Sequence, residues 1–378
     1  MKKLIINSAI VGAITGLVFV SLQKYVKKAL WYGGPDVDDY KIFYNRVIEA
    51  GKHIPWRKHS NYNKFVIPKK RRDIIESYNP IAALVIQNEK IIYEEYWDGY
   101  TKDSVSNSFS AAKSIVSLLI GIALDEGKIA SLDQKIGDFI KAYSTGSKSE
   151  LTIRQVLTMS SGLNWKETYV TPFSTTAKAY YGSDLDSLIS GLDVVEKPGV
   201  EFEYLSGNTQ LLAMVVQAAT GKHISDFTSE KIWKHIGAQH DALWNLDGKN
   251  GMEKAYCCFN TNVRDFARFG QLILNKGKWN GKRIISKKYV KEATSPKKYL
   301  KDKLTGDTVD FYGFQWWIIT YNGMQIPYMR GILGQYIFVI PDKNAVVVRL
   351  GHNRSKEIIN HHPKDVYDYL EDAFLLLK

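Results

Sequence analysis

The chain has 378 residues, of which 45% are hydrophobic and 24% charged, a composition typical of a globular protein with a substantial core. Its net charge of +12 is concentrated near the N-terminus, where residues 1–72 carry 15 Lys and Arg but 4 Asp and Glu. The remainder is nearly neutral, which disfavours nucleic acid as a partner. The only cysteines, Cys257 and Cys258, are adjacent, so we expect no disulfide framework and place them in the core.

An uncharged apolar segment lies near the N-terminus, at residues 4–22. As a helix it would reach roughly 28 Å, just enough to cross the hydrocarbon core of a bilayer. We therefore predict a single-pass transmembrane anchor within residues 1–28, with the main domain extracytoplasmic. A cleaved signal peptide is the alternative, although no small-x-small cleavage site precedes Gln23. Lysines flank both ends of the segment, so charge does not fix its orientation.

Residues 29–76 are rich in Tyr, Trp, Lys and Arg and are predicted to form a basic linker. Its run at residues 69–72, Lys-Lys-Arg-Arg, suits either anionic headgroups or plain solvation. The compact domain is predicted to span residues 77–378. It opens with a β-hairpin, because apolar runs at residues 82–87 and 91–97 flank a polar turn.

The C-terminal part has four more apolar runs of strand length, followed by an amphipathic helix at residues 365–377. The pattern between residues 110 and 290 is mainly helical. Strands at both ends of the domain predict an α+β fold, in which one antiparallel sheet is flanked by helices and carries an inserted, mainly helical subdomain. The predicted C-terminal strands are residues 314–320, 326–330, 335–340 and 345–350.

A Ser-x-x-Lys sequence, Ser110 to Lys113, stands at the start of a long apolar helix. Residues three apart share a helix face, so the hydroxyl and the amine point the same way. A partly desolvated Lys can lose its proton near neutral pH and then take one from the hydroxyl. The same spacing at Ser21 and Ser295 lacks this setting, so Ser110 and Lys113 are the predicted catalytic pair.

Several motifs in order resemble those of the serine β-lactamase-related superfamily, which includes class C β-lactamases and 6-aminohexanoate-dimer hydrolase. The similarity extends from about residue 81 to about residue 378. It implies a β-lactamase/penicillin-binding-protein-like fold and a serine hydrolase. The motifs that carry it lie at residues 109–114, 151–163, 262–270 and 313–317.

The resemblance implies a catalytic tyrosine at Tyr204, in the position of the family's Tyr-x-Asn or Tyr-x-Ser element. We expect the Lys113 ammonium to lower the pKa of this phenol, so that Tyr204 relays the proton to the leaving group. Ser206 stands where β-lactamases have Asn, and we expect it to bond Lys113 or the substrate. Tyr169 loosely matches a substrate-facing position.

The family's Lys-Thr-Gly strand is matched by Met329-Arg330-Gly331. Gly331 would let the substrate approach the backbone, and the N–H groups of Ile332 and Ser110 would form the oxyanion hole. Met329 lacks the Lys charge, which disfavours β-lactam chemistry, although Arg330 could bind a substrate carboxylate.

We predict structural roles for the aromatic residues near the predicted site. One of Trp316 and Trp317 should face the core and the other the pocket wall or solvent. His352 is predicted to have a structural rather than a catalytic role. The His361-His362 pair is predicted to lie at the surface rather than to bind a metal.

These features predict a membrane-anchored serine hydrolase that cleaves a small ester, linear amide or peptide through an acyl-enzyme, with no metal and no cofactor. Two alternatives stay open. One is D-Ala-D-Ala peptidase or β-lactamase activity, and the other is a catalytically silent relative that binds cell-wall peptide.

Overall fold

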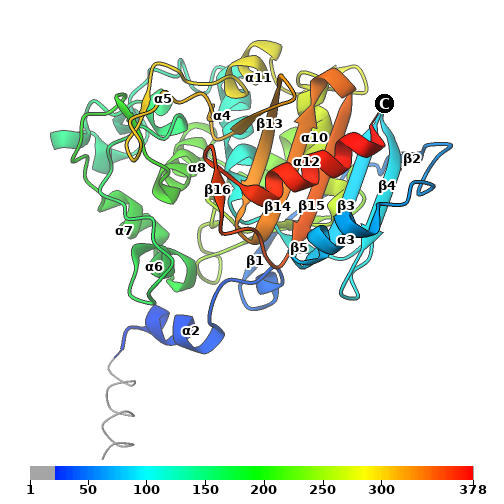
Figure 1. Ribbon diagram of the computed structural model, residues 1–378. Coiled ribbons are helices and arrows are strands. Elements are labelled where there is room, and N and C mark those ends of the chain that lie inside the picture. The colour runs from blue at the N-terminus through cyan, green and yellow to red at the C-terminus, as the bar shows by residue number, and fades with distance from the viewer. Residues whose placement is uncertain (1–21, 378) are drawn as a thin grey trace, which may run out of the picture.

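The computed structural model describes residues 22–377 (Figure 1). Its centre is a seven-stranded sheet with the order β12-β13-β14-β15-β3-β4-β2. Neighbouring strands are antiparallel except for β2 and β4, which are parallel. In sheet order the strands span Trp317–Tyr321, Met324–Gly331, Gln335–Ile340, Ala345–Gly351, Pro80–Gln87, Lys90–Tyr96 and Arg57–Lys58.

Strands from the two ends of the domain meet where β3 pairs with β15. The predicted α+β class, with one largely antiparallel sheet assembled from both ends, is therefore confirmed. Local sequence closes the hairpins. Asn88 and Glu89 both have positive φ between β3 and β4, as do Asn322 and Gly323 between β12 and β13, and such two-residue turns match the twist of the strands.

Helices cover both faces of the sheet, and alternate residues of each strand point into different cores. Leu84 and Ile337 pack in the core that contains α4 (Ala112–Asp125) and α10 (Val263–Leu274). Val85 and Phe338, one residue further along, pack in the core beneath α12 (Lys364–Leu376). Figure 1 shows α12 and α3 (Lys69–Glu76) crossing this second face.

The inserted region is mainly helical, as predicted, and its longest helix, α8, packs against α4. This contact sets one wall of the catalytic region beside the start of α4. The helices of this region are α5 (Ile153–Leu157), α6 (Thr175–Tyr181), α7 (Leu185–Ser190), α8 (Ser206–Thr220) and α9 (Ile224–Thr228).

A second, four-stranded sheet with the order β1-β7-β8-β5 was not predicted. Its strands are only two to four residues long, too short for a pattern of alternation. They span Asn45–Ile48, Ala242–Asn245, Phe259–Thr261 and Ser106–Asn107. The remaining α-helices and strands are α2 (Lys24–Tyr32), α11 (Lys287–Ala293), β6 (Glu201–Phe202), β9 (Lys278–Trp279), β10 (Lys282–Arg283), β11 (Lys301–Asp302), β16 (Ile358–Ile359) and β17 (His362–Pro363).

The region expected to be a linker, residues 29–76, is built into the domain instead. It supplies β1 and β2, which pair with β7 and β4, as well as α3. Its basic side chains find carboxylate partners in the body: Arg71 Nε lies 2.7 Å from Asp372 Oδ1, and Arg72 Nη1 lies 2.8 Å from Glu95 Oε1. Composition indicated a solvated segment because it does not reveal such distant partners.

The transmembrane helix included in the predicted fold class requires correction. No helix among residues 22–377 is long and apolar enough to cross a bilayer. The predicted span, residues 4–22, lies outside the described residues except for Leu22. The extracytoplasmic location stays a prediction.

Candidate active site

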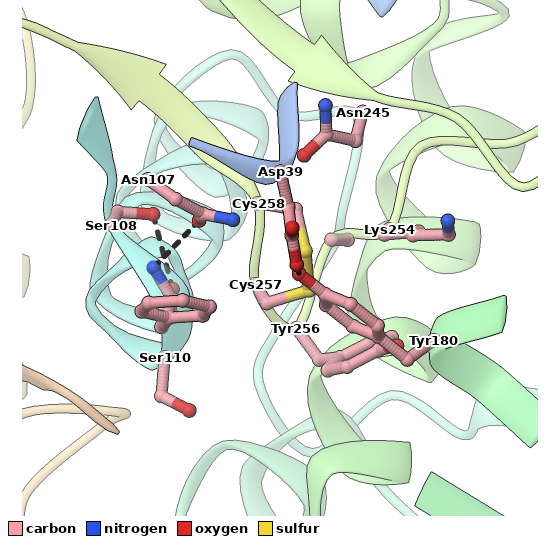
Figure 2. The surroundings of a disulfide bond; sticks show 12 residues. Asp39, Asn107, Ser108, Ser110, Tyr180, Asn245, Lys254, Tyr256, Cys257 and Cys258 are labelled. Carbon is pink, nitrogen blue, oxygen red and sulfur yellow. Dashed lines mark hydrogen bonds between the residues drawn. A yellow bond between two sulfur atoms is a disulfide. The ribbon is translucent and has the colours of Figure 1, made fainter. Parts of the chain in front are cut away.

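Ser110 lies in a 3-10 turn, Phe109–Ala111, that leads directly into α4. Phe109 has a φ of +42°, a conformation that L residues rarely adopt. Its N–H donates to Asn107 Oδ1 at 2.8 Å, which helps to hold this turn (Figure 2). Strained backbone of this kind is common where a reactive side chain must be presented. The N-terminus of α4 also favours negative charge that develops beside Ser110.

Lys113 is 1% exposed, and its Nζ lies 3.2 Å from Ser110 Oγ. Nζ also lies 3.1 Å from Ser206 Oγ and donates to the Tyr256 carbonyl oxygen at 2.7 Å. Burial lowers the pKa of Lys113 to about 7, although the negative charge of Glu167 partly opposes this shift. Lys113 can therefore be a neutral amine, and so a proton acceptor, near neutral pH.

Tyr204 lies beside the same pair, with Lys113 Nζ 5.2 Å from its ring centroid. The expectation that its pKa is lowered is wrong. Burial raises the pKa well above that of a free tyrosine, and the charge of Glu167 raises it further, while the interaction with Ser110 lowers it only in part. Tyr204 is therefore a neutral phenol, suited to donate a proton rather than to remove one.

Glu167 is a site residue that the sequence did not reveal. One carboxylate oxygen accepts the Ser206 N–H and the other accepts the Ser206 hydroxyl, at 2.7 and 2.8 Å. It also accepts hydrogen bonds from Trp165 Nε1 and from the Tyr169 hydroxyl. Nothing around Glu167 in the sequence marks it, because only the fold brings this loop to the start of α8.

Ser110 and Ile332, which carry the predicted oxyanion donors, line one cavity. Gly331 permits this approach. A Cβ at this position would lie 2.2 Å from the Ser108 carbonyl oxygen, so a larger residue would push β13 away from the Ser110 turn. The glycine is thus required by the chain's own backbone, whereas we had expected it to make room for substrate.

The Arg330 side chain contacts Trp317 and His361. Its guanidinium lies over the Trp317 ring, 3.1 Å from the centroid, and Nη1 donates to the His361 carbonyl oxygen at 2.9 Å. Arg330 does not line the Ser110 cavity, and Met329 is fully buried. The described residues of β13 therefore present no cation to a substrate carboxylate in that cavity.

The nearby aromatic residues mostly take the structural roles predicted for them. Trp316 is fully buried, and Trp317 packs against Tyr204 with the ring centroids 5.5 Å apart. His352 lies beside Asp36 and Asp98. Of the His pair predicted to be superficial, His362 is in fact buried and bonds the Tyr328 hydroxyl.

Cys257 and Cys258 are joined to each other by a disulfide bond, which was not predicted from the sequence. The bond lies close to the catalytic turn, as Figure 2 shows. Cys257 lines the same cavity as Ser110 and follows Tyr256, whose carbonyl accepts from Lys113. Tyr169 lines this cavity too, with 56% of its surface exposed.

Comparison with known proteins agrees with this geometry. A 6-aminohexanoate-dimer hydrolase of Paenarthrobacter ureafaciens is 27% identical over 285 residues, which cover 71% of each chain. A Bacillus anthracis protein described as a candidate 6-aminohexanoate-dimer hydrolase superposes with a TM-score of 0.76 at 21% identity, covering 90% of this chain and 91% of that one. A family VIII carboxylesterase superposes with a TM-score of 0.65 at 17% identity, covering 85% and 99%.

The model of the beta-lactamase family matches residues 74–357, a span that contains Ser110, Lys113 and Tyr204. The match covers well over half of the chain and confirms the resemblance carried by the motifs. The chain therefore belongs to the beta-lactamase family and is a serine hydrolase.

Proposed function

We propose that the chain hydrolyses a small ester or a linear amide through an acyl-enzyme on Ser110. One observation carries the proposal: Lys113 Nζ lies 3.2 Å from Ser110 Oγ, in surroundings that bring the pKa of this lysine to about 7. An amine with that pKa is half deprotonated at neutral pH, where a general base is most effective.

In the first half-reaction, the Lys113 amine takes the hydroxyl proton while Ser110 Oγ bonds to the substrate carbonyl carbon. The carbonyl electron pair moves onto its oxygen, which the N–H groups of Ser110 and Ile332 bind. The intermediate then expels the alcohol or amine, which takes a proton from Tyr204. Lys113 returns its proton to the Tyr204 phenolate, and the acyl group stays on Ser110.

In the second half-reaction, water attacks the acyl carbon and loses its proton to Lys113. The bond to Ser110 Oγ breaks and the serine takes the proton from Lys113, so the carboxylic acid product leaves with the enzyme unchanged. The first half-reaction uses Ser110, Lys113 and Tyr204, the second uses Ser110 and Lys113, and the reactants are the substrate and water.

Esters and linear amides are favoured as substrates because β-lactams and D-Ala-D-Ala peptides carry a carboxylate that needs a cationic partner. Met329 is buried in place of the family lysine, and Arg330 already bonds the His361 carbonyl. The names of the relatives, an amide-dimer hydrolase and a carboxylesterase, support cleavage of linear amides and esters. The intact Ser110, Lys113 and Tyr204 argue against a silent binding protein.

The test is labelling of the full chain with a fluorophosphonate probe, read by intact mass, together with turnover of p-nitrophenyl acetate, p-nitrophenyl butyrate and nitrocefin. We expect one adduct, lost in Ser110→Ala, and a far higher kcat/KM for the esters than for nitrocefin. Labelling that persists in Ser110→Ala would refute the assignment of the nucleophile. Efficient turnover of nitrocefin with negligible ester cleavage would instead support the β-lactamase alternative.

A further inference from the structure

We propose that the cavity beside Ser110 binds an uncharged, apolar acyl chain, so that the preferred substrates are esters or amides of medium-length fatty or arylalkyl acids. This inference rests on the proposed function and specifies which half of the substrate the cavity holds. The cavity has a volume of about 230 Å³. Its walls come from α2 and the turn after it, the loop at residues 169–174, α6, and Tyr256 with Cys257.

The lining of the cavity carries no charge. None of the described residues that line it is an Asp, Glu, Lys, Arg or His. A charged acyl group would therefore lose its hydration without gaining an ionic partner, which is strongly unfavourable. Neutral apolar groups lose little on entry, because the surface they contact consists largely of aliphatic and aromatic side chains.

Three of the four tyrosines of the wall have their hydroxyl groups engaged in the protein, whereas the buried Tyr256 hydroxyl makes no hydrogen bond to any described residue. Tyr180 donates to Asp39 Oδ2 at 2.6 Å, and Tyr181 donates to the Gly33 carbonyl oxygen at 2.9 Å. The Tyr169 hydroxyl bonds Glu167. These three hydroxyl groups are already satisfied, so what Tyr169, Tyr180 and Tyr181 offer a ligand is ring surface. Figure 2 shows Tyr180 joined to Asp39, with Tyr256 and Cys257 near the Ser110 turn.

The position of Tyr204 indicates which half of the substrate enters. A residue that protonates the leaving group must contact the leaving atom. Tyr204 does not line the cavity; it packs instead against Tyr312 and Trp317. The leaving group therefore faces Tyr204, and the space lined by Ser110 and Ile332 receives the acyl group.

The mouth of the cavity extends the same surface. Leu30 of α2 and Val170 line the cavity and are 51% and 93% exposed. Both side chains reach from the wall into solvent. A chain longer than the cavity would continue over these two residues, so we expect the preference to level off with length rather than to end sharply.

The first test measures kcat/KM for p-nitrophenyl esters of acetate, butyrate, hexanoate and octanoate, with the 6-aminohexanoate and adipate monoesters as charged analogues of hexanoate. We expect about a fourfold gain for each added methylene until the cavity is full. Hexanoate should exceed both charged analogues by at least about 100-fold. Equal turnover of hexanoate and either charged analogue would overturn the proposal.

Two variants and one control locate the effect. Ala177→Phe fills the cavity from α6 and should lower the hexanoate-to-acetate ratio by at least about tenfold. Val170→Asp changes an exposed residue, so folding is not at risk, and it should reduce octanoate turnover more than acetate turnover. Lys178→Phe, next to Ala177 but outside the cavity lining, is the control and should behave like wild type. An unchanged chain-length preference in both cavity variants would refute the assignment of the cavity.

The two proposals fail in different ways. Absence of turnover of every ester, acetate included, would refute the proposed function but not the cavity assignment. Calorimetry with Ser110→Ala then tests the cavity alone, because octanamide should bind and 6-aminohexanamide should not. Equal binding of the two amides would overturn the inference even in an active enzyme.

Discussion

The two sides of Ser110 differ in chemistry. On the inner side, hydrogen bonds connect the buried Lys113 to the buried Ser206, and Ser206 to the partly buried Glu167. On the outer side lies a cavity whose described lining residues carry no charge. The polar side sets the proton affinity of Lys113, and the apolar side selects the acyl group. Changes on the inner side should therefore alter kcat and its pH dependence, whereas changes in the cavity should alter the choice of substrate.

The largest effect on activity is expected from a change of Ser110, which lies between the two sides. Ser110→Ala should lower ester hydrolysis by about 10⁴-fold or more, because no acyl-enzyme can form. Its thermal unfolding should stay near that of wild type, since Ser110 is only partly buried and contributes a hydroxyl rather than core volume. Ser295→Ala, in the other described Ser-x-x-Lys sequence, is the matched control. Wild-type turnover in Ser110→Ala would refute the mechanism.

Removal of the base should be nearly as severe. Lys113→Met keeps the length of the side chain in a fully packed site but removes the proton acceptor, and kcat should fall by about 10²- to 10⁴-fold. Single-turnover kinetics should show slow acylation, while a fluorophosphonate should still label Ser110 slowly. A rise in KM alone, with kcat retained, would place Lys113 in substrate binding instead.

Tyr204→Phe should lower kcat by about 10²-fold, since the variant loses the proton donor to the leaving group. The effect should be larger for amides than for p-nitrophenyl esters, because an amine must be protonated to leave. Tyr312→Phe is the control: Tyr312 packs against Tyr204, and its hydroxyl makes no hydrogen bond to any described residue. Equal losses in the two variants would point to packing rather than proton transfer.

The main sheet was predictable because its strands are apolar runs bounded by turns. β14 was predicted at its observed bounds, and β15 to within one residue. The short strands of the second sheet carry no pattern, and β1 and β5 depend on partners more than a hundred residues away, β7 and β8. Composition likewise indicated a linker at residues 29–76, because distant carboxylates such as Asp372 are invisible locally.

In the site, the pair Ser110 and Lys113 was predictable because three residues span one helical turn. Glu167 was not, since it is a lone carboxylate in a loop that reaches Ser206 only through the fold. The cavity was not predictable either, because α2 supplies part of its wall from a segment that had been assigned to the anchor and linker. Catalytic chemistry here is local in sequence, whereas the substrate cavity is assembled from distant segments.

The disulfide between Cys257 and Cys258 adjoins both sides, because Cys257 lines the cavity and the preceding carbonyl accepts from Lys113. Cys258 has a φ of +71°, an uncommon backbone conformation. Reduction should let the Tyr256 carbonyl shift and should lower kcat by up to about tenfold. Activity with and without dithiothreitol tests this, and the double variant Cys257→Ala/Cys258→Ala should not respond. An equal response of that variant would place the effect elsewhere.

The smallest effect concerns the pH dependence set by the inner side. The pKa of Lys113 is about 7, so kcat/KM should fall as the pH drops below this value and the amine becomes an ammonium. The charge of Glu167 stabilises that ammonium and raises the pKa of Lys113. Glu167→Gln should therefore move the acidic limb to lower pH, by less than about one unit. Glu150→Gln, which removes a distant exposed carboxylate, should leave the limb in place. A shift of the limb to higher pH would mean that Glu167 acts on Lys113 through Ser206 geometry rather than through its charge.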